Sequence, residues 1–367
     1  MLCSTFLSGN EARIELRVCY ILAKSKSINC IKGAHFYVIN GRVLILFPGA
    51  LGDFVCFLPV LESLAQRESI DVLARAEFSD VAPPCAHVGS LERSEIRSLF
   101  VPGGGTDEKV RHFFDSYDCT YSWMGSGDSS CKQELHTATQ GRLRLFQFDA
   151  RNPQMHQADY YLSCLQADLV PSTPRIPLMP DANHWAEVYW AENSLKSKPV
   201  LAIAPGSGAR EKNWPLISFE TIARWWRERV GGAVITILGP VEDERGGYDS
   251  LCHQGQAIRG ITLGRLAATI ARCSLYVGND SGISHIAAAL GVPTAAVFGP
   301  SSVNKWAPRG KSVLVLRHQV PCSPCAVSAM KSCPHRDCLT ALTPAEVIRQ
   351  LEGWPPVVTL TSQGARD

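Results

Sequence analysis

The fold is decided by residues 275–300, LYVGNDSGISHIAAALGVPTAAVFGP. An apolar run at 275–277 predicts the end of a buried strand, and the apolar residues after Ser281 recur at helical spacing. Gly291, followed two residues later by a proline, ends that helix in the usual way. A second apolar run at 294–298 completes the order strand, polar turn, helix, strand. This order predicts a βαβ unit of a parallel sheet.

The polar turn of this unit predicts a ligand site. It stands at the carboxyl end of a strand and the amino end of a helix, where ligands of open α/β sheets bind. The amides of Ser281, Gly282 and Ile283 are left free at the start of the helix and favour an anion, most simply a phosphate. Asp280 would repel a phosphate, so we expect it to accept hydrogen bonds from sugar hydroxyls. The turn therefore predicts a nucleotide sugar as the ligand.

Length and composition predict a globular protein with room for two domains. The chain has 367 residues, of which 46% are apolar and 19% charged, so it can bury a substantial core. A formal net charge of +2 gives no electrostatic argument for nucleic acid. We expect neither a membrane span nor a secretory signal. Cysteines such as Cys56, Cys164 and Cys273 lie within apolar patterns, so we expect them to be buried and reduced, in the cytoplasm.

The alternation of strands and helices begins near residue 42. Residues 43–47 predict a buried strand, 48–53 a glycine-containing turn, and 54–66 a helix. Pro59 falls inside that helix, so the helix either kinks there or begins only near Leu58.

The second half of the chain repeats the pattern. We expect strands at 200–204 and 233–238 and helices at 219–229, 263–271 and 344–351. A Pro-rich segment at 171–177 marks the linker. The chain is therefore expected to be α/β, with two Rossmann-like domains facing each other across a cleft. The expected parts are an extension of uncertain order at 1–40, a first domain at 41–175, a second domain at 176–355 and a tail at 356–367.

Four stretches carry a resemblance to a known family. They are PGALGD at 48–53, APGSGAREKNWP at 204–215, GNDSGISH at 278–285 with FGP at 298–300, and a set of C-terminal cysteines. In this order, over roughly residues 42–352, they resemble the family 9 glycosyltransferases, the ADP-heptose:lipopolysaccharide heptosyltransferases. The resemblance implies a GT-B fold, an inverting mechanism that uses no divalent metal, and an ADP-heptose donor bound by the second domain.

The resemblance also assigns the catalytic base. Asp53 matches the family's catalytic aspartate, and inversion needs a carboxylate that takes the proton of the acceptor hydroxyl as that hydroxyl attacks. The alternative for Asp53 is a cap on the following helix. Gly49 and Gly52 lie in the same turn, on the acceptor side. This turn lacks the basic residue or serines found in many family members, which leaves the identity of the acceptor open.

Donor contacts follow in the same way. Lys212 matches the family lysine on the donor pyrophosphate, and Asp280 the aspartate that holds donor sugar hydroxyls. Without a metal, the leaving diphosphate must be neutralised by Lys212, by the amides at Ser281 and Gly282, and by Ser207.

For three further polar residues, the sequence allows either a contact with the donor or an ordinary structural role. His285 follows Ser281 by one helical turn, and it either contacts the donor or is a satisfied histidine packed against the sheet. Glu242 and Glu244 lie where family members contact the ribose or base. We place Glu242 in the donor site, and a surface carboxylate is the alternative for each.

The C-terminal cysteines Cys322, Cys325, Cys333 and Cys338 have a spacing suited to four thiolates around zinc or iron. Similar cysteines occur in family members without an established metal role, and a subgroup that glycosylates autotransporter adhesins carries an iron-binding cysteine cluster. A metal bound here is expected to be structural, and no cofactor is expected to be required for catalysis.

We therefore expect a cytoplasmic glycosyltransferase that moves heptose from ADP-heptose to a lipopolysaccharide core or related glycan, with at most peripheral contact at the inner face of the inner membrane. One alternative is a transferase that uses another nucleotide sugar or a protein acceptor. A nucleotide-sugar epimerase is a second, against which the in-order motifs argue. A non-catalytic nucleotide-sugar-binding protein is a third, against which the presence of Asp53, Lys212 and Asp280 argues.

Overall fold

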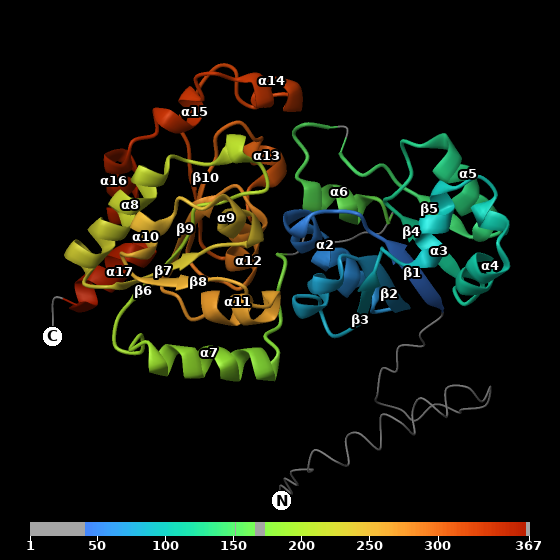
Figure 1. Ribbon diagram of the computed structural model, residues 1–367, viewed down its shortest axis with the longest axis horizontal. Coiled ribbons are helices and arrows are strands. Elements are labelled where there is room, and N and C mark those ends of the chain that lie inside the picture. Colours follow the sequence, from blue (N-terminus) through green and yellow to red (C-terminus); the bar gives the residue numbers. More distant parts are fainter. Residues whose placement is uncertain (1–40, 151, 166–172, 365–367) are drawn as a thin grey trace, which may run out of the picture. The chain divides into compact units, whose positions relative to one another are not determined.

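The computed structural model describes residues 41–150, 152–165 and 173–364. The extension expected at 1–40 and the start of the expected linker at 171–177 lie outside these ranges. Two parallel sheets with flanking helices make up the described chain (Figure 1). The expected α/β class and the two Rossmann-like halves are therefore confirmed. None of the described helices is long and apolar enough to cross a bilayer.

The first sheet has the strand order β3-β2-β1-β4-β5, with all pairs parallel. Its strands are β1 (Arg42–Leu46), β2 (Ser69–Ala74), β3 (Ala86–Ser90), β4 (Cys119–Ser122) and β5 (Leu143–Leu145). The order reverses between β1 and β4, so the ligand crevice of this half is expected at the carboxyl end of β1. Helices α2 (Leu51–Leu64), α3 (Ser94–Arg97), α4 (Glu108–Asp115), α5 (Ser129–Ala138) and α6 (Gln157–Ser163) accompany the strands.

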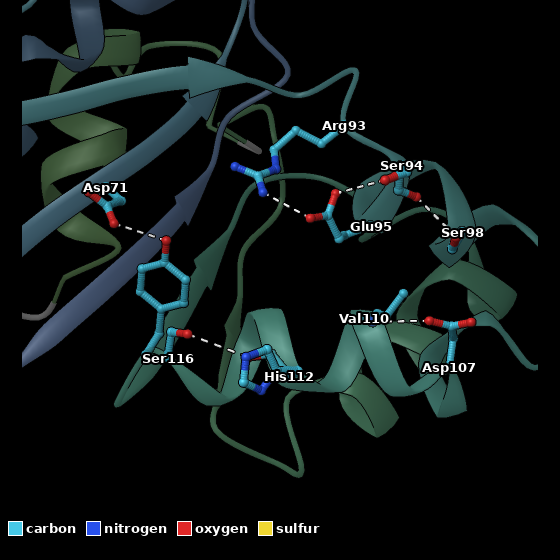
Figure 2. Close-up of polar contacts among 10 residues, drawn as sticks. Asp71, Arg93, Ser94, Glu95, Ser98, Asp107, Val110, His112 and Ser116 are labelled. Carbon is cyan, nitrogen blue, oxygen red and sulfur yellow. Dashed lines mark hydrogen bonds and ion pairs between the residues drawn. The ribbon is translucent and has the colours of Figure 1, made fainter.

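Polar contacts fasten the outer helices of this half (Figure 2). Asp107 precedes α4, and its Oδ1 accepts hydrogen bonds from the amides of Lys109 at 2.9 Å and Val110 at 3.2 Å, which satisfies two amides at the start of the helix. Just after α4, the Tyr117 hydroxyl donates to Asp71 Oδ2 at 2.9 Å, and Asp71 lies on β2. Helix α4 is thus capped at its start and tied to the sheet beyond its end.

The second sheet has the order β11-β10-β9-β6-β7-β8, again with all pairs parallel. Its strands are β6 (Val200–Ala204), β7 (Ala233–Ile237), β8 (Gln256–Ile258), β9 (Leu275–Asn279), β10 (Thr294–Val297) and β11 (Val313–Leu316). The order reverses between β6 and β9. The two motifs at 204–215 and 278–285 leave the carboxyl ends of these two strands, which is where a doubly wound sheet binds its ligand.

Helix α7 precedes the strands of the second half, and the other helices lie between or after them (Figure 1). They are α7 (Pro180–Glu192), α8 (Leu216–Trp225), α9 (Pro240–Arg245), α10 (Asp249–Cys252), α11 (Leu263–Ile270), α12 (Gly282–Ala289), α13 (Val303–Trp306), α14 (Val327–Ser332), α15 (Asp337–Thr340), α16 (Pro344–Glu352) and α17 (Pro355–Gly364). Helix α17 runs through most of the expected tail, and its Val357 is fully buried against the core of this half.

Two helices differ from the expected boundaries. Helix α2 begins at Leu51 and contains Pro59, so a start near Leu58 is wrong. Pro59 has no N–H and cannot bond the Val55 carbonyl, yet the helix tolerates it because residues 54–61 are all buried in the core. Helix α8 begins three residues earlier than expected and passes at Trp226 into a π-helical turn that ends at Gly231.

Candidate active site

The two glycine-containing turns of the two halves meet at the amino ends of α2 and α12. A Cβ atom on Gly282 would lie 2.7 Å from Leu51 Cβ, and one on Gly52 would lie 3.3 Å from His285 Cδ2. Only glycine at 282 leaves room for this approach without a shift of the neighbouring chain. Because the amino end of a helix carries a partial positive charge, the convergence of two such ends favours an anionic ligand.

Asp53 lies in the first turn of α2 and serves the helix as well as the site. Its Oδ2 accepts a hydrogen bond from the Ala50 amide at 3.0 Å, and the Tyr161 hydroxyl donates to its Oδ1 at 3.4 Å. The capping alternative is therefore partly right, although Asp53 caps from the third helical position. Burial raises the pKa of Asp53 from 3.8 to about 6, against the lowering effect of the Ala50 hydrogen bond and with a smaller rise from the nearby Asp149. A carboxylate with this pKa suits a general base near neutral pH.

Glycine at 49 makes the geometry of this turn possible. A Cβ atom there would lie 2.5 Å from Phe47 Cε1 and 2.7 Å from Asp53 Cβ. Neither neighbour can give way easily, since Phe47 is buried among aromatic rings and Asp53 is fixed by α2. Gly49 therefore positions the carboxylate sterically and makes no polar side-chain contact with an acceptor.

Lys212 and Asp280 form an ion pair with each other. The Lys212 Nζ atom lies 2.9 Å from Asp280 Oδ2, with side chains 28% and 6% exposed. Asp280 follows β9, while Lys212 stands in the loop that follows β6, so the pair bridges the point where the strand order reverses. The structure thus brings together the two residues expected for the pyrophosphate and for the sugar hydroxyls.

The loop after β6 is held in shape by buried polar contacts. Ser207 Oγ lies 2.6 Å from Asn213 Oδ1 and 2.7 Å from the Ala209 carbonyl, so its one hydroxyl proton is already used within the loop. Asn279 was not singled out from the sequence. It is fully buried, donates to the Pro205 carbonyl at 2.7 Å and accepts from the Trp214 amide at 2.9 Å. Its position as a polar residue at the end of an otherwise apolar strand could have indicated this role from the sequence.

The two candidate glutamates occupy different environments. Glu242 is buried, and its Oε2 accepts from the Gly239 amide at 3.1 Å. A Cβ on Gly206 would lie 2.0 Å from Glu242 Oε1, so the carboxylate lies directly against the loop after β6. Glu244 is exposed. The surface alternative is therefore wrong for Glu242, which is buried against the loop after β6, whereas Glu244 is exposed.

His285 lies on α12 and is buried against α2. Its Nδ1 lies 3.6 Å from Cys56 Sγ, and burial lowers its pKa to about 4, so the ring is neutral. This environment is that of a histidine packed against a neighbouring helix. Ser281 precedes α12 as its N-cap residue, but its side chain makes no capping hydrogen bond. The first amides of α12, those of Gly282 and Ile283, are therefore not satisfied by a side-chain cap.

A polar cluster that no pattern in the sequence indicated joins α6 to the segment after α13. Arg309 pairs with Asp159 through two parallel hydrogen bonds, the first from Nη1 to Oδ1 at 2.6 Å. His156 Nε2 donates to the Ala307 carbonyl at 2.8 Å, while its Nδ1 accepts from the Ala158 amide at 3.1 Å. Helix α6 also carries Tyr161, so this cluster supports the residue that contacts the candidate base.

The C-terminal cysteines line one cavity of about 220 Å³ together with His335 and Asp337. Within the described ranges, however, no three His, Cys, Asp or Glu side chains are grouped closely enough to ligate a metal ion. As arranged, Cys322, Cys325, Cys333 and Cys338 do not form the expected four-thiolate centre. Among the three cysteines expected to be buried, Cys56 and Cys273 are, while Cys164 is partly exposed.

Comparison with known proteins finds matches over the second half of the chain. Residues 157–334 match the model for glycosyltransferase family 9 (heptosyltransferase). The lipooligosaccharide heptosyltransferase 2 of Campylobacter jejuni is 29% identical over 42% of this chain and 50% of its own length. For the lipopolysaccharide heptosyltransferase 1 of Pseudomonas aeruginosa the values are 28%, 42% and 47%. The matched part of the chain thus spans about half the length of these curated relatives.

Solved structures resemble nearly the whole described chain. A family 9 glycosyl transferase from Veillonella parvula superposes with a TM-score of 0.68 at 21% identity, over 89% of this chain and 99% of the other. The Escherichia coli ADP-heptose lipopolysaccharide heptosyltransferase II gives a TM-score of 0.63 at 19% identity, over 88% and 99%. At these identities the likeness shows the fold, and the expected GT-B fold is confirmed.

Proposed function

The chain belongs to glycosyltransferase family 9, and from this membership we propose that it transfers heptose from ADP-heptose to a lipopolysaccharide core or a related glycan. Its curated relatives include heptosyltransferases of three genera. One structural neighbour, an E. coli heptosyltransferase, is described in complex with ADP and another with ADP-2-deoxy-2-fluoro heptose. A lipid-linked acceptor would bring the protein to the inner face of the inner membrane.

The observation that carries the proposal is the placement of Asp53 beside the donor site. Its pKa of about 6 leaves it ionised at neutral pH yet basic enough to accept a proton. The turn that holds it packs against Gly282, two residues after Asp280. In this proposal the base lies on one half and the nucleotide-sugar site on the other, and the contact between the two turns supports a direct transfer between them.

The reaction is a single displacement. The acceptor hydroxyl oxygen attacks the anomeric carbon of the heptose while Asp53 takes the hydroxyl proton. The new C–O bond forms as the bond from that carbon to the diphosphate oxygen breaks, and ADP leaves with the bonding electrons. Attack from the face opposite the leaving group inverts the anomeric carbon.

Charge on the departing ADP is neutralised by the protein itself. Lys212 supplies one positive charge, and the first amides of α12 supply hydrogen bonds that need no rearrangement during the reaction. Donor binding requires Lys212 to turn from Asp280 toward the pyrophosphate, which leaves Asp280 to accept hydrogen bonds from heptose hydroxyls. In this proposal Glu242 accepts a hydrogen bond from a ribose hydroxyl, and its position against Gly206 supports that role. No divalent metal has a role in this scheme.

The C-terminal cysteines stay outside the reaction. A structural metal there would require their side chains to move closer together than the described arrangement. Elemental analysis of protein purified anaerobically, with zinc and iron measured per chain, tests this directly. A metal content near zero would remove the metal hypothesis without affecting the transfer proposal.

Thermal denaturation with a panel of nucleotides and nucleotide sugars tests the donor. A ligand that binds only the folded chain raises its melting temperature. We expect ADP and ADP-heptose to stabilise the wild-type protein, and Lys212→Ala to reduce the effect. Stabilisation by UDP or GDP sugars instead would indicate another nucleotide sugar, and stabilisation by none would favour a protein without this activity. With a glycan acceptor in hand, NMR of the product gives the anomeric configuration.

A further inference from the structure

Gln157, the first residue of α6, is a polar residue that the fold buries completely, at 0% exposure. Helix α6 packs against α2, whose first turn carries Asp53 (Figure 1). Burial of a side-chain amide costs free energy unless its N–H and C=O groups find partners. The partners of Gln157 therefore show what its burial achieves.

Backbone groups just before α6 fix the orientation of the Gln157 amide. Its Nε2 donates to the Phe148 carbonyl at 2.9 Å, and its Oε1 accepts from the Ala150 amide at 3.5 Å. A backbone carbonyl only accepts and a backbone N–H only donates, so the two ends of the side-chain amide cannot be exchanged. Because Nε2 carries two protons, one N–H remains for a further acceptor.

The further partner is the Tyr161 hydroxyl, one helical turn along α6. Burial, and then the charge of Asp53, raise the pKa of Tyr161, so its hydroxyl stays protonated. The hydrogen bond from Gln157 acts in the opposite direction on this pKa, which is the effect of a donor on the phenol oxygen. With Gln157 donating to its oxygen, Tyr161 directs its own proton toward Asp53 Oδ1 at 3.4 Å.

This relay fixes the orientation of the Asp53 carboxylate. Tyr161 donates to Oδ1 and the Ala50 amide donates to Oδ2, so each oxygen is held by a donor. A phenol hydroxyl rotates about its C–O bond, so without Gln157 its proton is free to turn away from Asp53. A base that turns out of line with the acceptor hydroxyl loses rate even when its pKa is suitable.

Residues beside Gln157 attach the same helix to the second half. His156 Nε2 donates to the Ala307 carbonyl, and Asp159 is paired with Arg309. Helix α6 is therefore fixed on two sides, against α2 and against the segment after α13. A relay on a fixed helix keeps its geometry during a reaction better than one on a loop.

On the basis of the proposed transfer activity, we propose that Gln157 is a positioning residue for the reaction. Its amide orients the Tyr161 hydroxyl and thereby keeps the Asp53 carboxylate in the orientation that accepts the proton. Gln157 acts only through Tyr161, so its effect should disappear where that hydroxyl is absent.

The native pKa of Asp53 gives a test that needs no substrate. It is obtained by measuring the free energy of unfolding across pH for each protein with and without Asp53→Asn. Tyr161→Phe removes a hydrogen bond that lowers this pKa, and we expect a rise of up to about one pH unit. Gln157→Met, which keeps the length of the side chain without its polar ends, should raise the pKa in the same way. In the Tyr161→Phe background, Gln157→Met should add nothing.

Turnover measures the consequence for the reaction. Gln157→Met should lower kcat by about 10-fold, the loss expected for one hydrogen bond to a charged group, and should move the acid limb of the pH–rate profile to higher pH. Thermal stabilisation by ADP should be retained, because the donor residues Lys212 and Asp280 belong to the other half. The exposed Gln133 of α5 gives the matched control Gln133→Met, with unchanged pKa of Asp53 and unchanged kcat.

Three results would overturn the proposal: an Asp53 pKa at the wild-type value in folded Gln157→Met, a shift that adds to that of Tyr161→Phe, or an unchanged kcat. If Gln157→Met does not fold, Gln157→Glu, which keeps the shape, takes its place. An ionised glutamate accepts the Tyr161 proton and adds a negative charge near Asp53, so the pKa should rise at least as far, and a wild-type value would refute the relay. Failure of the transfer proposal appears separately, as a wild-type protein that ADP does not stabilise, and leaves the pKa test readable.

Discussion

Replacing Asp53 with asparagine should remove most of the turnover and, at the same time, stabilise the fold at alkaline pH. Asp53 is a carboxyl whose pKa rises from 3.8 to about 6 because the folded protein buries it. The native state therefore holds the proton more tightly than the unfolded chain does. Above the unfolded pKa, ionised Asp53 costs stability, and the full cost is present above about pH 6. Asparagine carries no charge at any pH and avoids this cost.

The size of the effect follows from the two pKa values. A rise from 3.8 to about 6 corresponds to about 3 kcal/mol at pH 8, falling to about half of that at pH 5, where native Asp53 is mostly protonated. The asparagine side chain keeps an Oδ1 atom that can accept from the Ala50 amide, so the helix cap survives. We therefore expect the stability of Asp53→Asn relative to the wild type to rise by roughly 1 kcal/mol between pH 5 and pH 8.

Chemical denaturation at both pH values measures this difference. The exposed Glu92, whose carboxylate makes no ion pair among the described residues, gives Glu92→Gln as a control for the change in net charge. Thermal stabilisation by ADP should be retained in Asp53→Asn, which separates loss of chemistry from loss of donor binding. A relative stability that is the same at pH 5 and pH 8 would show that the carboxyl is not perturbed, and would remove the physical reason for assigning it as the base.

Three further variants examine its surroundings. Lys212→Ala should lower turnover by about 10²-fold, because the positive charge that neutralises the leaving diphosphate is lost. Steady-state kinetics in which the donor KM and kcat are both unchanged would contradict this. Tyr161→Phe removes a hydrogen bond that lowers the pKa of Asp53, so the acid limb of the pH–rate profile should move to higher pH. An acid limb at the wild-type pH would argue against a Tyr161–Asp53 hydrogen bond in solution. Asp159→Asn and Arg309→Gln should show a coupling of about 1 kcal/mol in a double-mutant cycle by denaturation, at the low end for a bidentate pair because both side chains are partly exposed; additive effects would exclude the pair.

Strong periodicity made most of the fold predictable. Strands of a parallel sheet are buried on both faces, so β1 and β9 consist of short apolar runs in the sequence. The polar or glycine-containing turns that follow them are therefore easy to recognise. The start of α2 was less readable. Its first turn is Leu51, Gly52 and Asp53, a sequence that looks like a loop because glycine and aspartate favour turns. The helix forms there because the turn packs against α12, and contacts of that kind leave no local pattern.

The partners of the site residues were not predictable for the same reason. Lys212 and Asp280 lie 68 positions apart, and Arg309 and Asp159 lie 150 apart. Each motif indicated a ligand site, yet the spacing of residues along the chain does not indicate which charged side chains form ion pairs with each other. The sequence analysis placed Glu242 in the donor site, but its burial beside an exposed Glu244 depends on helix geometry, since Glu242 accepts from the Gly239 amide at the start of α9.

The pairing of nearby cations with other carboxylates explains why Asp53 keeps its raised pKa. Three cationic side chains of the described chain are each paired with a carboxylate other than Asp53: Lys212 with Asp280, Lys305 with Asp149, and Arg309 with Asp159. Among the described residues, the hydrogen bonds to the Asp53 carboxylate come from uncharged groups, including the Ala50 amide and the Tyr161 hydroxyl. A cation paired with Asp53 would lower its pKa and make it a poorer base. In the proposed mechanism, these pairings leave Asp53 without a cationic partner, and its pKa therefore stays high enough for it to accept a proton.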